Sequence, residues 1–297
     1  MVRVDKELCS RCGLCAKVCP HKLFEVRAKE VLVTADGCMA CGHCRAVCPV
    51  SAVQVTDVAD VLSFQTFSER TESMAPGDFE TDRLVQLMRS RRSCRNYRQD
   101  VVDIEILEDL VRIGTTAPSG TNSQSWQYTI LPRRKDVKSL GELTAGYYRE
   151  LNSQARNPVY RLLAKIFAGD ALGKYYREYY DSVQEALRQW DEEQVDRLFH
   201  GAAAAILVTG ETTASCPAED ALLATQNILL AAHAMGLGSC LIGFVVEAVR
   251  RSQKMKKALG LGGTTRLYSV IALGYPAITY QHVAGRRRVQ PRILHLA

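Results

Sequence analysis

Eleven cysteines are spread unevenly along this 297-residue chain, and eight of them lie within residues 9–48. They form two runs of identical spacing, Cys-x2-Cys-x2-Cys-x3-Cys followed by proline, and the second run repeats the first after 29 residues. The runs are Cys9, Cys12, Cys15 and Cys19, and then Cys38, Cys41, Cys44 and Cys48. Thiolates are soft metal ligands, so this density and spacing indicate a local metal site rather than a disulfide framework.

The spacing predicts two 4Fe–4S clusters with crossed ligation. Three closely spaced thiolates surround one cubane, and the x3 step carries the fourth thiolate to the other cluster. The first cluster is then expected to be held by Cys9, Cys12, Cys15 and Cys48, and the second by Cys38, Cys41, Cys44 and Cys19. Zinc also takes four thiolates, but its sites usually combine two separated Cys pairs. His21 and His43 lie at non-ligand positions and are expected at the surface or behind the ligands.

Residues 1–58 resemble the bacterial two-cluster ferredoxins, so we expect a small ferredoxin-like domain over residues 1–60. Gly13 and Gly42 follow the second cysteine of each run, where they leave room for backbone beside a cluster. Alternating apolar residues predict short strands at Val2–Val4, Leu23–Val26, Val31–Thr34 and Ala52–Thr56. The segment has few apolar residues for a core, so cluster binding should supply much of its folding free energy.

The composition is that of an ordinary globular protein, with 47% apolar and 24% charged residues. No apolar run reaches the roughly 18–20 residues of a membrane span, and the charged N-terminus lacks the apolar region of a signal peptide. A cytoplasmic protein is therefore expected. The net charge of +6 is not gathered into a basic stripe with aromatic residues, which argues against nucleic-acid binding.

A second domain is expected over residues 81–297, after a linker at 61–80 that lacks periodicity and collects Ser, Thr, Pro and Gly. Twenty residues span at most about 70 Å, so the first domain could serve its own chain or a neighbouring one. The expected elements are helices from Thr81, at Ile104–Ile113, through the Tyr-rich region 141–198 and at Ala218–Met235, with strands at Gln127–Leu131, Ala203–Thr209 and Leu267–Leu273. Strands and helices in this order predict an α+β domain.

Three motifs in this domain could bind a ligand. The segment Arg91-Arg92-Ser93-x-Arg95 offers donors for a phosphate or a polarised carbonyl, or is a solvated helix end. The turn from Pro118 to Gln124 has small side chains and amides that can approach a flat ligand, or is an ordinary loop. The segment Gly236–Gly243 after the long helix is typical of a helix cap followed by a buried strand.

Together and in this order, the motifs resemble those of the nitroreductase family of FMN enzymes over residues 81–297. The matching elements are Arg-Arg-Ser-x-Arg, Ala-Pro-Ser-Gly-x-Asn-x-Gln-x-Trp, Gly-Leu-Gly-Ser-Cys-x-Ile-Gly, and Leu-Gly-Tyr-Pro followed by a basic cluster. The resemblance implies a homodimer with FMN at the subunit interface.

The resemblance also assigns site residues. The FMN phosphate, ribityl chain and pyrimidine edge would be contacted by Arg91, Arg92, Ser93 and Arg95. The phosphate would also be reached by one of Arg286, Arg287 and Arg288. The segment passing beside the flavin ring, where a backbone N–H can meet N5, would be Leu241, Ile242 and Gly243. The segment supplied by the partner subunit would be Pro118, Ser119, Gly120 and Asn122. Ser125, in place of the usual proline, and His282, near a usually basic position, depart from the family pattern.

The remaining thiols, those of Cys94, Cys216 and Cys240, are expected to be buried packing groups. No obligatory side-chain nucleophile is expected, because the cofactors carry the chemistry and the protein positions them. Catalytic side chains are therefore left unassigned.

A flavin reduced by hydride needs no one-electron carriers, so their fusion favours electrons that arrive singly. We expect a reduced ferredoxin or flavodoxin to charge the clusters, which reduce FMN for transfer to a small organic acceptor. Three alternatives remain open. The flow could be reversed, NAD(P)H could reduce FMN directly while the clusters store electrons, or the chain could be an electron-transfer subunit without a small substrate.

Overall fold

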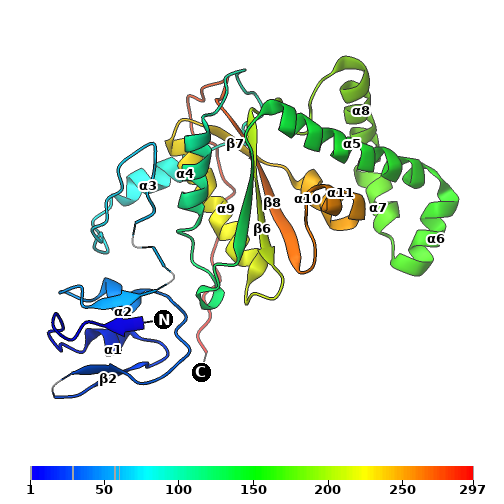
Figure 1. Cartoon of the computed structure of the whole chain (residues 1–297). Helices are drawn as coiled ribbons and strands as arrows, with labels where there is room; N and C mark the ends of the chain where they lie inside the picture. Colours follow the sequence, from blue (N-terminus) through cyan, green and yellow to red (C-terminus); the bar gives the residue numbers. More distant parts are fainter. Residues whose placement is uncertain (1, 29, 57, 60, 297) are drawn as a thin grey trace.

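The computed structural model describes residues 2–28, 30–56, 58–59 and 61–296. A small N-terminal module of short strands and helices lies beside a larger domain built on a four-stranded sheet (Figure 1). This is the α+β fold with a ferredoxin-like N-terminal domain that the sequence predicted. None of the described helices is long and apolar enough to cross a membrane.

The larger domain is organised around an antiparallel sheet with the strand order β5-β6-β8-β7. Its strands are β5 (Trp126–Leu131), β6 (Ala204–Glu211), β7 (Gly238–Leu241) and β8 (Thr265–Gly274). The predicted strands at 127–131, 203–209 and 267–273 match β5, β6 and β8 to within two residues at every end. β6 is buried along nearly its whole length, so helices must cover both of its faces.

Helices pack on both faces of the sheet (Figure 1). One face carries α4 (Ile104–Gly114) and α9 (Pro217–Ala234), whose core includes Ile206 and Ile228. The other carries α5 (Arg134–Arg156) and α10 (Gly243–Arg251), whose core includes Leu207 and Val245. Ile206 and Leu207 belong to opposite layers because successive strand side chains point to opposite faces.

The remaining helices of the larger domain are α3 (Thr81–Ser90), α6 (Pro158–Ala168), α7 (Ala171–Glu178), α8 (Tyr180–Arg188) and α11 (Gln253–Ala258). The helices α5 to α8 account for the predicted Tyr-rich helical region and extend away from the sheet (Figure 1). The helices α10 and α11 had no counterpart among the predicted elements. They are short, and their apolar residues Val249 and Met255 become recognisable as core only against β8 and α5.

The N-terminal module consists of two strand pairs and two short helices. The pairs are β1 (Val2–Val4) with β4 (Val53–Val55), and β2 (Phe24–Val26) with β3 (Val31–Val33). The helices are α1 (Leu14–Val18) and α2 (His43–Ala46). All four predicted strands are present, each shortened to three residues or kept at three. The core between them is small and includes the cysteine side chains of Cys15 and Cys44.

The segment between the two domains is attached to the larger one. Residues 61–80 contain no helix or strand. However, the backbone N–H groups of Gln65 and Thr66 and the Thr66 hydroxyl donate to the fully buried carboxylate of Asp109 at 2.7–3.0 Å. Arg112 donates to the same carboxylate at 2.8 Å. Only the part before Gln65 therefore remains as a connection between the domains.

Candidate functional site

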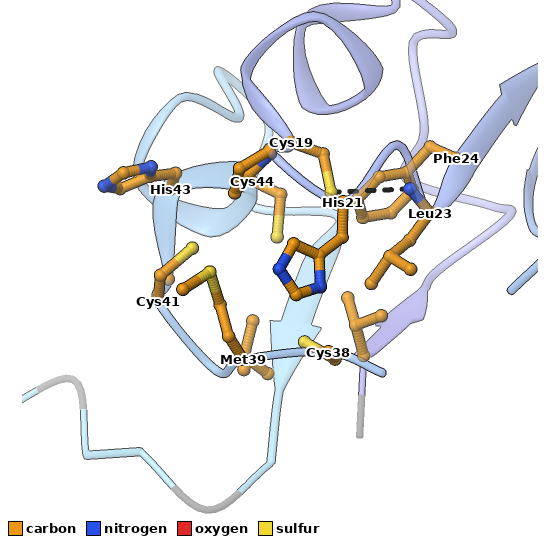
Figure 2. Close-up of a pocket in the computed structure, with 13 residues that line it drawn as sticks. Cys19, His21, Leu23, Phe24, Cys38, Met39, Cys41, His43 and Cys44 are labelled. Atoms are coloured by element: carbon orange, nitrogen blue, oxygen red, sulfur yellow. Dashed lines mark hydrogen bonds between the residues drawn. The ribbon is translucent and has the colours of Figure 1, made fainter. Parts of the chain in front are cut away.

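The structure brings the eight cysteines of the N-terminal module together around two cavities. One cavity is lined by Cys19, Cys38, Cys41 and Cys44 (Figure 2). The other is lined by Cys9, Cys12, Cys15 and Cys48. Each cavity thus takes three thiols from one run and the fourth from the other run. This is the grouping that crossed ligation of two clusters requires.

The two runs also share their backbone conformation. Gly13 and Gly42, which precede α1 and α2, have φ values of 75° and 72°. An added Cβ at Gly42 would meet no atom within 4 Å, and one at Gly13 would meet only Val26 at 3.6 Å. The left-handed backbone therefore requires glycine here whatever the space available to a side chain.

The chemistry of the donors fits iron–sulfur clusters. The backbone N–H groups of Leu23 and Ala52 point at the sulfurs of Cys19 and Cys48, at 3.4 and 3.2 Å, and these are equivalent positions of the two runs. Such N–H···S contacts stabilise thiolate charge and tune a cluster. Within the described ranges, no three His, Cys, Asp or Glu residues lie where they could hold a single metal ion. Four thiols around a cavity suit a cubane, in which each thiolate binds a different iron.

The predicted arginine segment lies at one edge of the larger domain's sheet. Ser93 pairs with Ser239 of β7, and the Cys94 N–H donates to the Ser239 carbonyl at 2.9 Å. The segment Leu241–Gly243 begins with the last residue of β7, so the structure brings these two predicted FMN-contacting segments together. Arg91 and Arg92 are half-buried and Arg95 is exposed.

An unpartnered polar atom marks this location. Ser239 is 1% exposed, and its hydroxyl has no hydrogen-bond partner among the described residues. A buried hydroxyl without a partner is unusual and costs about 1–3 kcal/mol. Arg91 and Arg92 directly precede Ser93, which pairs with Ser239, and this donor set fits a ligand that carries a phosphate and polar ring edges.

The three cysteines outside the module divide between two environments. Cys94 and Cys240 are buried as predicted, and burial raises the pKa of both thiols. The prediction that Cys216 is buried was wrong, because its side chain is exposed at the N-terminal end of α9. The following Pro217 is the signal that was missed, since proline favours the first turn of a helix and the residue before it lies at the helix end.

The loop Pro118–Asn122 lies at the opposite end of the domain from the arginine segment. The Gly120 N–H donates to Asp220 in the first turn of α9 at 2.9 Å, whereas the arginine segment pairs with Ser239, just beyond the last turn of α9 that contains His233. Thirteen residues of helix separate Asp220 from His233, which is about 20 Å at 1.5 Å per residue.

The sheet gives the same separation. Ser239 pairs with Leu273, which pairs with Ala204, the first residue of β6. Trp126, just after the loop, pairs with Gly210 near the other end of β6. Six strand residues again correspond to about 20 Å. Hydrogen bonds to a ligand act over about 3 Å, so no single polar group of a ligand can contact both predicted FMN motifs of one chain.

The C-terminal segment runs alongside the arginine segment before it becomes exposed. The Ala277 N–H donates to the Asn96 carbonyl at 2.8 Å, and Arg92 lies over the Tyr280 ring at 5.1 Å. The predicted phosphate contacts lie further along in exposed chain, at Arg286, Arg287 and Arg288. The structure therefore places Tyr280 against the arginine segment, a contact that sequence reasoning missed.

The two domains also meet at a contact that was not predicted from the sequence. The Asn122 side-chain amide donates to the carbonyl oxygens of Met39 and Ala40, at 3.0 and 3.1 Å. These two residues lie between Cys38 and Cys41, and Met39 lines the cavity that these cysteines share (Figure 2). No local sequence pattern predicts a contact between residues that are 83 positions apart.

A cysteine module with two four-thiol cavities, joined to an α+β domain that carries an arginine segment at one edge of its sheet, is the architecture expected of an iron–sulfur flavoprotein. Residues 88–275 match the model of the nitroreductase family, and residues 1–49 match that of the 4Fe-4S dicluster domain. The chain belongs to the nitroreductase family and carries an N-terminal 4Fe–4S dicluster domain. It is an FMN-dependent oxidoreductase.

Relatives and solved structures agree with this assignment. An NADH dehydrogenase of Thermus thermophilus is 27% identical over 63% of this chain and 83% of its own length. An iodotyrosine deiodinase of Thermotoga neapolitana is 24% identical over 65% of this chain and 88% of its own length. The crystal structure of a nitroreductase with bound FMN from Bacteroides fragilis covers 73% of this chain and 100% of its own, with a TM-score of 0.50 and 19% identity. These likenesses cover the larger domain, as the span of the family match does.

Proposed function

We propose that this protein passes electrons from a low-potential one-electron donor through two 4Fe–4S clusters to FMN, which reduces a small organic acceptor. A reduced ferredoxin or flavodoxin is the donor class that suits one-electron carriers. The observation that carries the proposal is the position of the cysteine module. One of its two four-thiol cavities lies against Asn122, a residue of the predicted FMN motif.

The proposed cofactor sites follow the grouping of side chains in the structure. Four thiols around each cavity would hold one cluster, so Cys19 and Cys48 would each bind the cluster of the other run. The segments 91–95 and 241–243, joined by the pairing of Ser93 with Ser239, would hold the phosphate and the ring edge of FMN. FMN accepts electrons singly or as hydride and returns them either way, so it can link one-electron transfer to hydride transfer.

The protein is proposed to act as a homodimer. The loop Pro118–Asn122 and the segment 91–95 lie about 20 Å apart in one chain, measured along α9. A flavin site that uses both motifs therefore needs two copies of the chain, as the family resemblance implies. Thiol-ligated clusters also suit a reducing compartment, which is consistent with a cytoplasmic location.

A direct test compares electron donors. Stopped-flow mixing of the loaded protein with reduced ferredoxin should bleach FMN rapidly, and mixing with NADH should do so slowly or not at all. The matched control is Cys38→Ala/Cys41→Ala, which should retain FMN but lose reduction by ferredoxin. If NADH bleaches FMN rapidly and reduced ferredoxin does not reduce it, the proposed route of electrons is wrong.

A second candidate function is favoured by the name of one relative, the NADH dehydrogenase of Thermus thermophilus. In this alternative NAD(P)H reduces FMN directly and the clusters are accessory. The same stopped-flow comparison decides between the two. Turnover of a quinone, an enone or a nitroarene by the isolated protein would exclude a pure electron-transfer subunit.

A further inference from the structure

The cluster module meets the larger domain at a defined contact. Asn122 donates both of its amide hydrogen bonds to the chain between Cys38 and Cys41, at Met39 and Ala40. The Ala40 N–H in turn points at the Cys38 sulfur at 3.4 Å. A short path of hydrogen bonds therefore links the Cys38 thiol to the loop Pro118–Asn122.

The loop that presents Asn122 is held in a strained conformation. Thr121, Asn122 and Gln124 all have left-handed backbones, with φ values of 52°, 54° and 45°. Asp220, which is 2% exposed, accepts from the Gly120 N–H and from the Ser123 hydroxyl. Non-glycine residues persist in this region only where their surroundings hold them there. The backbone that carries Asn122 is thus held by contacts within the larger domain.

The connection between the domains keeps the module on its own chain. Gln65 and Thr66 are bound to the buried carboxylate of Asp109. Ten residue steps separate Val55, at the end of β4, from Gln65, and fully extended they span about 35 Å. Twenty free residues would have allowed about twice that distance. The anchored connection and the Asn122 contact both favour docking within one chain.

We infer that the Asn122 contact is an electron-transfer junction that works across the dimer. The second cavity, lined by Cys19, Cys38, Cys41 and Cys44, holds the cluster nearest the flavin. Its electrons go to the FMN gripped by the arginine segment of the partner subunit, and not to the FMN of its own chain. This inference rests on the proposed function and adds to it the order of the clusters and the identity of the flavin that each module serves.

The geometric reason lies in the length of α9. The docked module lies at the N-terminal end of this helix, beside Gly120 and Asp220, while the arginine segment pairs with Ser239, just beyond its C-terminal end. The chain's own arginine segment is about 20 Å further along the helix. We therefore assign a flavin completed by this chain's Asn122 loop to the arginine segment of a second copy.

The proposed step balances in electrons. Each transfer moves one electron from a reduced cluster, which is thereby oxidised, to FMN. Two transfers and one proton from water convert FMN to FMNH⁻. The reduced ferredoxin or flavodoxin supplies both electrons and is itself oxidised.

Two heterodimers of differently tagged chains test which flavin is served. In the split heterodimer, one chain carries Arg91→Ala/Arg95→Ala and the other carries Cys38→Ala/Cys41→Ala. In the joined heterodimer, one chain carries all four substitutions and the other is wild type. Each dimer keeps one intact arginine segment, and the FMN content of both preparations is measured first.

Opposite results are expected from the two dimers. The split heterodimer should retain rapid reduction of its FMN by reduced ferredoxin, because the intact cluster module faces the intact arginine segment of its partner. The joined heterodimer should lose it. Any result other than faster reduction in the split heterodimer overturns the inference. A wild-type homodimer that ferredoxin does not reduce would instead overturn the proposed function.

Hydrogen exchange tests the junction without any turnover. In the cluster-loaded protein, Asn122→Ala should speed exchange of the amides of residues 39–42, because the loop between Cys38 and Cys41 loses its anchor. Asn227→Ala is the control, since this exposed amide donates to Thr116 and does not contact the module. Equal exchange in the two variants would show that Asn122 does not hold the module.

Discussion

At the residue scale, the cysteines carry the most specific information. Eight thiols of one type fall into two sets of four, and each set includes one residue from the other run. Cys19 and Cys48 are the exchanged residues, and the sulfur of each accepts from the backbone N–H four residues later in the chain. The fourth position of each run is therefore the one that distinguishes crossed from uncrossed ligation.

Replacing the fourth cysteine should damage the cluster of the other run. Cys48→Ala should change the electron paramagnetic resonance signal of the cluster bound by Cys9, Cys12 and Cys15 and lower the iron content, while the other cluster stays comparatively intact. Cys19→Ala should do the reverse. The control is Cys216→Ala, an exposed thiol outside both cavities. Damage by Cys48→Ala to the Cys38-containing cluster alone would contradict the crossed arrangement.

Asp109 is the residue that turns a linker into an anchored segment. Burial acts to raise the pKa of its carboxyl, but hydrogen bonds from Gln65, Thr66 and Arg112 outweigh burial and leave the pKa below its usual value. A carboxyl whose pKa is lowered by folding contributes stability above its ordinary pKa of about 3.9, and this contribution is lost as the pH falls through the lower folded value. The anchor is thus fully formed at neutral pH.

Neutralising the Asp109 carboxylate should release the segment around Gln65 and Thr66 from the larger domain. We expect Asp109→Asn to cost about 2–3 kcal/mol at the anchor, because the amide cannot accept the same set of charge-assisted hydrogen bonds. Trypsin cleavage at Arg70 should accelerate more than tenfold, since cleavage follows the population of the open segment. The matched control is Asp103→Asn, an exposed carboxylate just before the same helix. Equal cleavage rates would show that the segment is held elsewhere.

At the element scale, the close packing of β7 against the arginine segment decides the position of the candidate FMN site. A Cβ added at Gly238 would lie 2.7 Å from both Cβ and Sγ of Cys94. Cys94 is buried between this strand and Tyr97. The glycine is therefore required by the close approach of two backbone segments, because its φ is not in the left-handed region.

Adding one methyl group at this strand should push the arginine segment away. We expect Gly238→Ala to destabilise the larger domain by about 1–3 kcal/mol, the usual cost of overpacking a core. Thermal unfolding measures this, and FMN affinity should fall with it. Gly262→Ala is the control, since an added Cβ there meets no atom within 4 Å. A melting temperature equal for both variants would mean that Cys94 can move aside at no cost.

At the scale of the whole molecule, the two domains differ in how they are stabilised. The larger domain buries two apolar layers on either side of its sheet, whereas the module has one small cluster that counts its own cysteines among its members. Three-residue strands and helices of four or five residues are too short to be stable without tertiary contacts. The module should depend on its clusters for its fold.

Removal of iron should therefore unfold only part of the protein. With a strong chelator under anaerobic conditions, the amides of residues 2–56 should lose protection from exchange, because metal binding supplies their folding free energy. The amides of β6 and β8 should stay protected. Hydrogen exchange with mass spectrometry resolves the two regions. Persistent protection of β1 and β4 after complete iron loss would show that the apolar cluster suffices.

The sequence alone determined the local features of both domains. The thiol spacing predicts the ligand sets, because cluster ligation is specified over a few residues. Short apolar runs placed β6 and β8 to within two residues at every end, since a strand buried on both faces is apolar along its length. The motif order indicated the family. The exposed position of Cys216 was missed because the proline after it was not interpreted as a helix start.

Only the tertiary structure decided how these parts meet. The strand order β5-β6-β8-β7, the Asp109 anchor and the contact of Asn122 with Met39 join residues tens of positions apart. Such contacts depend on the packing of whole elements, and no local spacing encodes them. The length of α9 and the register of β6 separate the two FMN motifs of one chain. That separation follows from helix rise and strand pairing, and it is the observation on which the proposed two-chain site rests.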